Sequence, residues 1–258
     1  GPAAVVNTID GEMSRHCEVT SVTPGCRERP ELIHGRCIRV ATGARRLPTV
    51  CEPGAAETTA DEGPERIGVL GGTFDPPHNG HLAIALEVRH QLDLHRMLLV
   101  VANDPWQKSG HRDVSPAADR LAMTRAAVHG IDGLEVSDLE IRRGGATYTA
   151  DTLAGLAAEH PGARLYLVVG SDAAVGLATW KRPDEVRALA TTVVVERGGV
   201  EQGRPPAGWD HVVVPVPALE ISSSDLRRRF GAGRPVEAMV PPAVIEVVHD
   251  AGLYGTRP

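Results

Sequence analysis

The sequence predicts an α/β fold, a Rossmann-like doubly wound parallel sheet preceded by a disordered N-terminal tail. Short apolar segments alternate with segments of helical spacing from residue 66 onward. The apolar segments lack the alternation of a half-exposed strand, which is typical of parallel strands covered by helices on both faces. Gly-rich or polar residues follow several of these segments, at the place where such sheets bind ligands.

The first 65 residues differ from the rest of the chain. Their apolar residues follow neither the strand nor the helix period, and PGAAETTADEGPE at 53–65 has the composition of a solvated linker. We therefore expect a disordered or loosely ordered extension at 1–65 and a folded domain at 66–258. We expect unligated thiols rather than a zinc site, because the cysteines lie at wide, irregular spacings in the extension, at Cys17, Cys26, Cys37 and Cys51.

The elements of the folded domain follow from its periodicity. Residues 67–70 are an apolar segment that stops at Gly71-Gly72, which predicts a buried strand entering a tight turn. Residues 79–92 have apolar side chains three or four positions apart and predict a helix. Later strands are expected at 97–101, 165–169, 191–195 and 212–216. Further helices are expected at 116–128, 148–159 and 184–189, from Ser222, and at 241–251 after a Pro-Pro start.

Composition limits the classes of function. The chain is 42% hydrophobic and 23% charged, as expected for a soluble domain with a real core. Its net charge of −6 argues against non-specific nucleic-acid binding. No segment approaches the roughly 18–20 apolar residues of a membrane-spanning helix, and no secretory signal follows Gly1-Pro2. We therefore expect a cytoplasmic protein without nucleic-acid or membrane partners, and a homo-oligomer is compatible with the sequence.

The strongest motif is GGTFDPPHNGH at 71–81, between the first strand and the first helix. Gly71 and Gly72 have no Cβ and let the backbone approach a ligand closely. His78 and His81 are three residues apart at the start of the helix, so both rings can face one side. The free N–H groups and the positive potential of a helix start favour an anion. The motif therefore predicts a cradle for a phosphoryl group.

This string resembles the H-x-G-H nucleotidyltransferase superfamily and, within it, bacterial nicotinate-nucleotide adenylyltransferases of the actinobacterial type. The resemblance covers nearly all of residues 66–255. It implies adenylyl transfer from ATP to nicotinate mononucleotide, giving deamido-NAD and pyrophosphate in NAD biosynthesis. It also implies a catalytic role for the two histidines, ATP binding by Gly71, Gly72, Thr73, Phe74, His78 and His81, and acceptor binding by Asp75.

The segment ISSSDLR at 221–227 reads by itself as a serine N-cap at the start of a helix. It is similar to the family pattern I-S-S-T-x-x-R. By that resemblance, Ser222 and Ser223 bind ATP phosphates, and Arg227 binds ATP and adds catalytic charge. Ser224 stands where the pattern has Thr, and it keeps the hydroxyl.

Two further segments are implied on the acceptor side. RRGGATYTADTL at 142–153 reads alone as a Gly turn before a capped helix, and the resemblance places Thr147 and Tyr148 against the nicotinate end. NDPWQK at 103–108 keeps the basic position of the family in Lys108, to which we assign catalysis and acceptor binding. Gln107 replaces the family's histidine, so the role of that histidine is not carried over.

The segment GSD at 170–172 follows an expected strand. The resemblance assigns Gly170 and Asp172 to ATP, with Asp172 accepting hydrogen bonds from ribose hydroxyls. Trp180 resembles the tryptophan that stacks on the nicotinate ring, with core packing as the alternative, and Arg197 is assigned to the acceptor. Lys181 stands where relatives often have Tyr, and RGG at 197–199 replaces Arg-Pro-Gly. The acceptor side therefore departs from the family pattern.

Mg²⁺ is expected to bind through the ATP phosphates with few or no protein ligands, because the chain has no dense carboxylate cluster. An adenylyltransferase acting on nicotinamide mononucleotide or phosphopantetheine is an alternative. A non-catalytic nucleotide sensor is a more distant one, since such a protein would lose a histidine or the Ser/Arg helix start. A cytidylyltransferase is disfavoured because the string R-T-x-G-I-S-T is absent.

Overall fold

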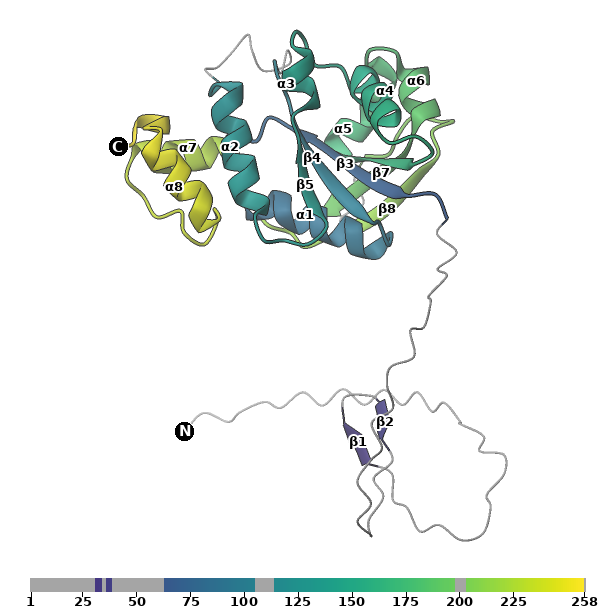
Figure 1. The fold of residues 1–258 in the computed structure, drawn as a ribbon, viewed down its shortest axis with the longest axis horizontal. Helices are drawn as coiled ribbons and strands as arrows, with labels where there is room; N and C mark the ends of the chain where they lie inside the picture. Colours follow the sequence, from purple (N-terminus) through teal and green to yellow (C-terminus); the bar gives the residue numbers. More distant parts are fainter. Residues whose placement is uncertain (1–30, 34–35, 39–62, 105–113, 198–202, 258) are drawn as a thin grey trace, which may run out of the picture. The chain divides into compact units, whose positions relative to one another are not determined.

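The computed structural model describes residues 31–33, 36–38, 63–104, 114–197 and 203–257 (Figure 1). The chain divides into two units, 1–58 and 59–258. In the first unit, strand β1 (Glu31–Ile33) pairs antiparallel with strand β2 (Arg36–Ile38). The sequence did not predict this pair, because strands this short show no period.

The second unit contains a six-stranded sheet with the order β5-β4-β3-β6-β7-β8. In chain order the strands are β3 (Arg66–Gly72), β4 (Arg96–Val101), β5 (Leu134–Ser137), β6 (Arg164–Gly170), β7 (Ala190–Arg197) and β8 (His211–Val216). Every neighbouring pair is parallel. Within this sheet, β3 is central: β4 and β5 are added in turn on one side of it, and β6, β7 and β8 are added in turn on the other side. The predicted doubly wound sheet is therefore confirmed.

Helices cover both faces of this sheet (Figure 1). One face carries α1 (Asn79–Gln91), α2 (Ala117–Val128), α7 (Ser223–Gly231) and α8 (Pro242–Asp250). The other face carries α3 (Leu139–Arg143), α4 (Thr149–Glu159), α5 (Ser171–Val175) and α6 (Pro183–Leu189). Short 3-10 turns follow α5 at Leu177–Thr179 and α8 at Leu253–Gly255.

The sheet separates two hydrophobic cores, which explains why its strands are apolar throughout. In β4, Met97 and Leu99 pack into the core shared with α1 and α2. The alternate residues Leu98 and Val100 pack into the core shared with α4. Successive side chains of a strand point to opposite faces, so a strand covered on both faces must be apolar at every position.

Some short elements were not predicted from the sequence. The segment between α2 and α4 contains the edge strand β5, which pairs with β4, and the five-residue helix α3. Helix α5 is also five residues long and follows β6 directly. Elements of four or five residues are too short to show a period, so tertiary contacts decide them.

The order of the strands places a ligand site at the carboxyl end of β3. The direction of winding reverses there, with β4 on one side of β3 and β6 on the other. Open parallel sheets bind ligands in the crevice at such a reversal. The motifs at 71–81, 103–108 and 170–172 lie where β3, β4 and β6 end.

Candidate active site

The turn after β3 is held in shape from within by Phe74. This side chain is 2% exposed, and its backbone has a φ of 51°, which is uncommon for a bulky residue. A Cβ added to Gly72 would lie 2.8 Å from the Phe74 ring, so packing requires a glycine there. A Cβ added to Gly71 would meet no described atom within 4 Å. Of these three residues assigned to ATP, Gly71 is the one beside which a ligand has room.

His78 and His81 lie on one side of the start of α1, as their spacing predicts. His78 is the N-cap, and its backbone N–H donates to Nδ1 of His81 at 3.2 Å. The two rings stack with their centroids 3.7 Å apart and an interplanar angle of 26°. The His81 ring also meets Phe74 edge-on, at 5.1 Å between centroids. The buried Phe74 ring therefore packs against the histidine pair through His81.

The glycine between the histidines has a role that sequence reasoning missed. A Cβ added to Gly80 would lie 3.0 Å from Nδ1 of His78 and 3.1 Å from its Cε1. These contacts are tighter than ordinary van der Waals packing, so a side chain at Gly80 would push the ring away. The signal was present in the motif itself, where glycine occupies the third position of H-N-G-H.

The start of α7 is bound directly to the turn that precedes α1. The Ser223 hydroxyl donates to the Pro76 carbonyl at 2.9 Å. Arg227 donates from Nη1 to the Asp75 carbonyl at 2.6 Å and from Nη2 to Ser224 Oγ at 3.1 Å. Ser222 is the N-cap, and its hydroxyl accepts the Asp225 N–H at 3.2 Å. The structure thus brings together the first two motifs, which lie far apart in the sequence.

The carboxyl group of Asp75 is buried inside the protein. The residue is 1% exposed, and its Oδ1 accepts a hydrogen bond from the Tyr254 hydroxyl at 2.8 Å. Its Oδ2 lies 3.7 Å from Nη1 of Arg227. This burial argues against the direct acceptor contact expected of Asp75. Sequence reasoning missed Tyr254, for which the only signal was the scarcity of tyrosine, with three in the chain.

Arg120 on α2 joins the ends of β3 and β4 and was also missed. Its side chain is among the largest fully buried ones, with 1% exposure. Nη1 donates to the carbonyls of Thr73 at 3.0 Å and Ala102 at 2.6 Å, and Nη2 donates to that of Asn103 at 2.9 Å. Burial lowers the pKa of the guanidinium, and Asp75 opposes that shift. In the sequence, Arg120 is indistinguishable from a charged residue on the surface of a helix, so only the structure reveals that it is buried.

The turn before α4 is tied to the end of β4. Asn103 donates from Nδ2 to the Gly145 carbonyl at 2.9 Å, and the Thr147 N–H donates to the Asp104 carbonyl at 3.3 Å. Both Gly144 and Gly145 have positive φ, near 70°, which glycine adopts readily. The predicted acceptor segment therefore lies beside the end of β4, on the same edge of the sheet as the histidines.

Tyr148 and the segment after Trp180 meet at this edge. Nζ of Lys181 lies 5.7 Å from the centroid of the Tyr148 ring. Arg182 forms an ion pair with Asp151 in the first turn of α4. Trp180 is half-buried and packs against the core under α4, so both roles considered for it are compatible with its place. The structure thus joins two segments that the sequence assigned separately to the acceptor.

Comparisons with known proteins agree with this geometry. A family model described as Cytidylyltransferase-like matches residues 69–229. The probable nicotinate-nucleotide adenylyltransferase of Saccharopolyspora erythraea is 44% identical over 195 residues, which are 73% of this chain and 89% of that protein. The protein of the same name from Corynebacterium glutamicum is 42% identical over 201 residues, covering 76% and 92%.

The chain belongs to the nicotinate-nucleotide adenylyltransferase family. Solved structures share its fold: Plasmodium falciparum nicotinic acid mononucleotide adenylyltransferase complexed with NaAD aligns with a TM-score of 0.62 at 19% identity, over 74% of this chain and 97% of that chain. The same protein complexed with APC aligns with a TM-score of 0.59. At this level of identity the likeness shows the fold alone.

The remaining residues that the sequence assigned to the adenylyltransferase site are placed as follows. Gly170 ends β6 and is the N-cap of α5, and Asp172 is exposed in the first turn of that helix. Lys108 falls in 105–113, outside the described residues, as do the neighbouring Trp106 and Gln107. Arg197 is placed only as the last residue of β7. The roles of Lys108 and Arg197, like those of the other assigned site residues, remain predictions from the sequence.

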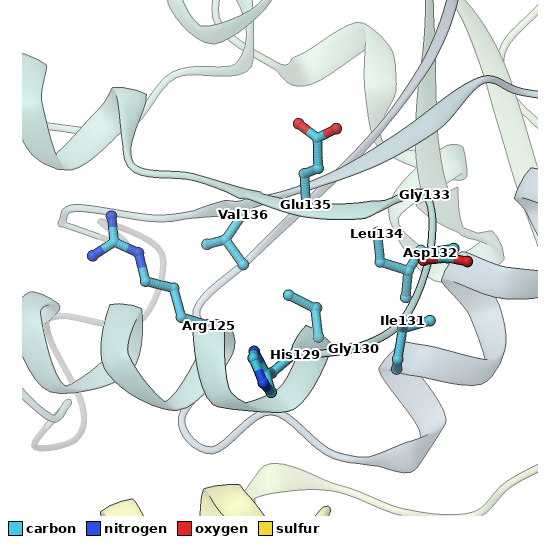
Figure 2. A pocket seen from close by; sticks show the side chains of 10 residues that line it. Arg125, His129, Gly130, Ile131, Asp132, Gly133, Leu134, Glu135 and Val136 are labelled. Atoms are coloured by element: carbon cyan, nitrogen blue, oxygen red, sulfur yellow. The ribbon is translucent and has the colours of Figure 1, made fainter.

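A groove elsewhere on the adenylyltransferase holds none of these residues. Figure 2 shows it at the outer edge of the sheet, between the end of α2 and β5, with Arg125, His129 and Glu135 among its lining side chains. Within the described ranges, no cluster of three or more His, Cys, Asp or Glu side chains could hold a metal ion. Among the same residues, no helix has the length and apolar character needed to cross a bilayer.

Proposed function

We propose that this protein transfers the adenylyl group of ATP to nicotinate mononucleotide, giving deamido-NAD and pyrophosphate. One observation carries the proposal: the His78–His81 pair stacks at the start of α1 and is bound through the turn to the start of α7, in a chain of this family. This arrangement provides ring N–H groups, serine hydroxyls and a guanidinium around one turn. Such a group of donors stabilises negative charge that develops on phosphate oxygens.

The chemistry needs no nucleophile from the protein. A phosphate oxygen of the acceptor attacks the α-phosphorus of ATP in line, and a new phosphorus–oxygen bond forms. The bond from the α-phosphorus to the oxygen that bridges to the β-phosphate breaks, and pyrophosphate leaves with the electron pair. Catalysis then consists of positioning and charge stabilisation.

The hydrogen bond between the two histidines supports a donor role for His81. Its Nδ1 accepts the His78 N–H, so the neutral ring carries its hydrogen on Nε2. Nε2–H is therefore the group with which His81 would contact an α- or β-phosphate oxygen. The start of α1 adds positive potential at the same place.

The serines and Arg227 would act partly through the turn that they hold. Ser223 and Arg227 bond to the carbonyls of Pro76 and Asp75, so they fix the turn while bringing a cation next to it. Lys108 would add a second cation, on the evidence of the sequence alone. Asp75 would hold Tyr254 and Arg227 in place, in contrast to the acceptor contact first expected of it.

The other assigned residues would bind the two ends of the substrates. Gly170 and Asp172 lie at the carboxyl end of β6, where Asp172 would accept hydrogen bonds from a ribose. Thr147, Tyr148 and Trp180, with Arg197, would form the acceptor side. The contact of Lys181 with Tyr148 supports a single acceptor site built from both segments.

Mg²⁺ would come with the ATP phosphates and supply charge neutralisation there. Asp75, the carboxylate within the histidine motif, is buried and bonded to Tyr254. It is therefore not placed as a ligand for a metal ion at the turn. The donors that do face the turn are N–H and hydroxyl groups, which fit phosphate oxygens rather than Mg²⁺.

A pyrophosphate-release assay with ATP and three separate acceptors tests the proposal. Nicotinate mononucleotide is expected to give the highest kcat/KM, with nicotinamide mononucleotide and phosphopantetheine far lower. A highest value with either of the other acceptors would assign the protein to that related activity. ATP binding without turnover on any acceptor would favour a nucleotide sensor and contradict the proposal.

A further inference from the structure

A buried carboxyl group on α3 lies directly behind the acceptor turn. Glu140 is 4% exposed, and Thr152 donates a hydrogen bond from its hydroxyl to Oε1 of Glu140 at 2.5 Å. Burial of a carboxyl group costs free energy, while an apolar side chain of the same size would fill this space without that cost. What the carboxyl group adds is directional bonding to the residues around it.

Those residues belong to the acceptor turn and the start of α4. The Thr152 hydroxyl also lies 3.2 Å from the carbonyl oxygen of Tyr148, the N-cap of α4. The pKa of Glu140 is raised by burial, and the hydroxyls of Thr152 and Thr147 and the backbone of Asn103 oppose that shift. Among the described residues, the carboxyl group is hydrogen-bonded through Oε1 to Thr152 in the first turn of α4. Its other oxygen, Oε2, and the hydroxyl of Thr147 are both buried without a hydrogen-bond partner in the part of the chain that the structure describes.

A second set of hydrogen bonds connects the acceptor turn to the histidine turn. Asn103 donates from its side chain to the Gly145 carbonyl at 2.9 Å, and its own carbonyl accepts from Arg120 at 2.9 Å. Arg120 also donates to the carbonyl of Thr73 in the turn after β3. The acceptor turn and the histidine turn are thus linked through the end of β4, while Glu140 is joined to the start of α4 through Thr152.

We propose that Glu140 is a positioning residue of the adenylyl-transfer site, which orients Tyr148 toward the acceptor by bonding the Thr152 hydroxyl that in turn contacts the Tyr148 carbonyl. The inference rests on the proposed function, because it takes the acceptor to be a mononucleotide bound at this turn. Glu140 itself does not touch the substrates. Its loss should weaken the acceptor's binding and leave that of ATP unchanged, since Thr73 is held independently by Arg120.

The test compares Glu140→Met with Glu140→Gln in steady-state kinetics with ATP and nicotinate mononucleotide. Met keeps the length without polar atoms, and Gln keeps a donor and an acceptor at the same place. Glu140→Met is expected to raise the KM for the mononucleotide by about tenfold, the scale of one lost hydrogen bond to a buried polar group. The KM for ATP should stay within about twofold of the value for the unaltered protein, which is the variation expected between independent sites. Glu140→Gln should restore most of the mononucleotide affinity.

A second pair of variants keeps the test open if Glu140→Met fails to fold. Thr152→Val removes the hydroxyl at constant shape, and Thr152→Ser keeps it. Thr152→Val should reproduce the rise in mononucleotide KM, and Thr152→Ser should not. Combining Glu140→Met with Thr152→Val should raise the KM no further than either change does alone, because both changes break the same bond.

The two levels of the proposal fail in different ways. Unchanged mononucleotide KM in folded Glu140→Met and Thr152→Val, or equal rises for both substrates, would overturn the positioning role. A loss of kcat in proportion to the loss of folded protein would also overturn the positioning role, since a residue that only stabilises the fold lowers activity in that proportion. Absence of turnover in the unaltered protein would instead overturn the proposed function.

Discussion

The Tyr254 hydroxyl donates a 2.8 Å hydrogen bond to Oδ1 of Asp75 and so ties the last turn of the chain to the turn that carries the histidines. The two residues are 179 positions apart. The backbone carbonyl of the same Asp75 accepts from Arg227 on α7. The C-terminal turn and α7 therefore both hold the turn that precedes the histidines, one through the side chain and the other through the backbone of Asp75.

We expect Tyr254→Phe to destabilise the protein by about 1–3 kcal/mol, because it leaves the buried Asp75 oxygen without its donor. Turnover should also fall, since Asp75 helps to hold the turn beside His78. Tyr166→Phe is a matched control, because Tyr166 is partly buried and makes no side-chain hydrogen bond within the described residues. Urea unfolding of both variants measures the difference, and equal effects would contradict this role of Tyr254.

The contribution of Tyr254 should depend on pH. Burial and the neighbouring Asp75 raise the pKa of the Tyr254 hydroxyl above the usual value of about 10. The unfolded chain therefore releases this proton first, and the stabilisation is fully present below about pH 10 and declines above it. The difference in unfolding free energy between the unaltered protein and Tyr254→Phe should be constant at lower pH and shrink toward pH 11. A difference that grows with pH would show that the sign is wrong.

We expect His81→Ala to lower turnover by roughly 10²–10⁴-fold, the scale for removing a donor that stabilises charge in the transition state. The free energy of unfolding should change little, because the His81 side chain is only partly buried. His90→Ala, exposed near the end of the same helix, is the control and should leave turnover unchanged. Near-normal turnover of His81→Ala with ATP and nicotinate mononucleotide would remove the histidine pair from the mechanism.

The two glycines of the turn should respond differently to Ala. Gly72→Ala places a Cβ 2.8 Å from the Phe74 ring and should destabilise the protein by about 1–3 kcal/mol through overpacking. Gly71→Ala meets no described atom within 4 Å and should leave stability nearly unchanged, while raising the KM for ATP. Thermal melts combined with kinetics separate the two. A normal KM for ATP in Gly71→Ala would mean that the ligand does not approach this residue.

Deletion of residues 1–60 should leave folding and turnover nearly intact. The sequence motifs all lie after this segment, and the second unit of the chain spans 59–258. The melting temperature and the kcat/KM of the shortened protein provide the measurement. A large loss of either would show that the extension packs on the domain or binds a metal that the domain needs.

We expect the protein to prefer nicotinate mononucleotide over the amide by roughly tenfold to a hundredfold in kcat/KM, because the amide leaves donors at the site unpaired. The Thr147 N–H already donates to Asp104, so other N–H groups near the start of α4 must meet the carboxylate. Lys181, beside Tyr148, should add to the preference, and Lys181→Met should reduce it. Equal values for both acceptors would contradict the acid preference and leave adenylyl transfer intact.

The sequence alone predicted the parallel sheet and the place of its main motifs. The strands β3, β4, β6, β7 and β8 are apolar segments whose character follows from burial on both faces, and α1 was visible in its spacing. The histidine pair was predictable as well, because His78 and His81 are three residues apart at the start of one helix, and this spacing places them on one side. These features are local, and local spacing is what a sequence displays directly.

The tertiary structure decided the features that depend on distant partners. Strand β5 forms because β4 offers it an edge, and Asp75 turns inward because Tyr254 and Arg227 reach it from the other end of the chain. Arg120 and Glu140 look like ordinary helix charges in the sequence, yet each is buried against backbone or hydroxyl groups of separate segments. A buried polar side chain is stabilised only by the partners around it. Those partners come together through folding, so no spacing within one segment could have indicated them.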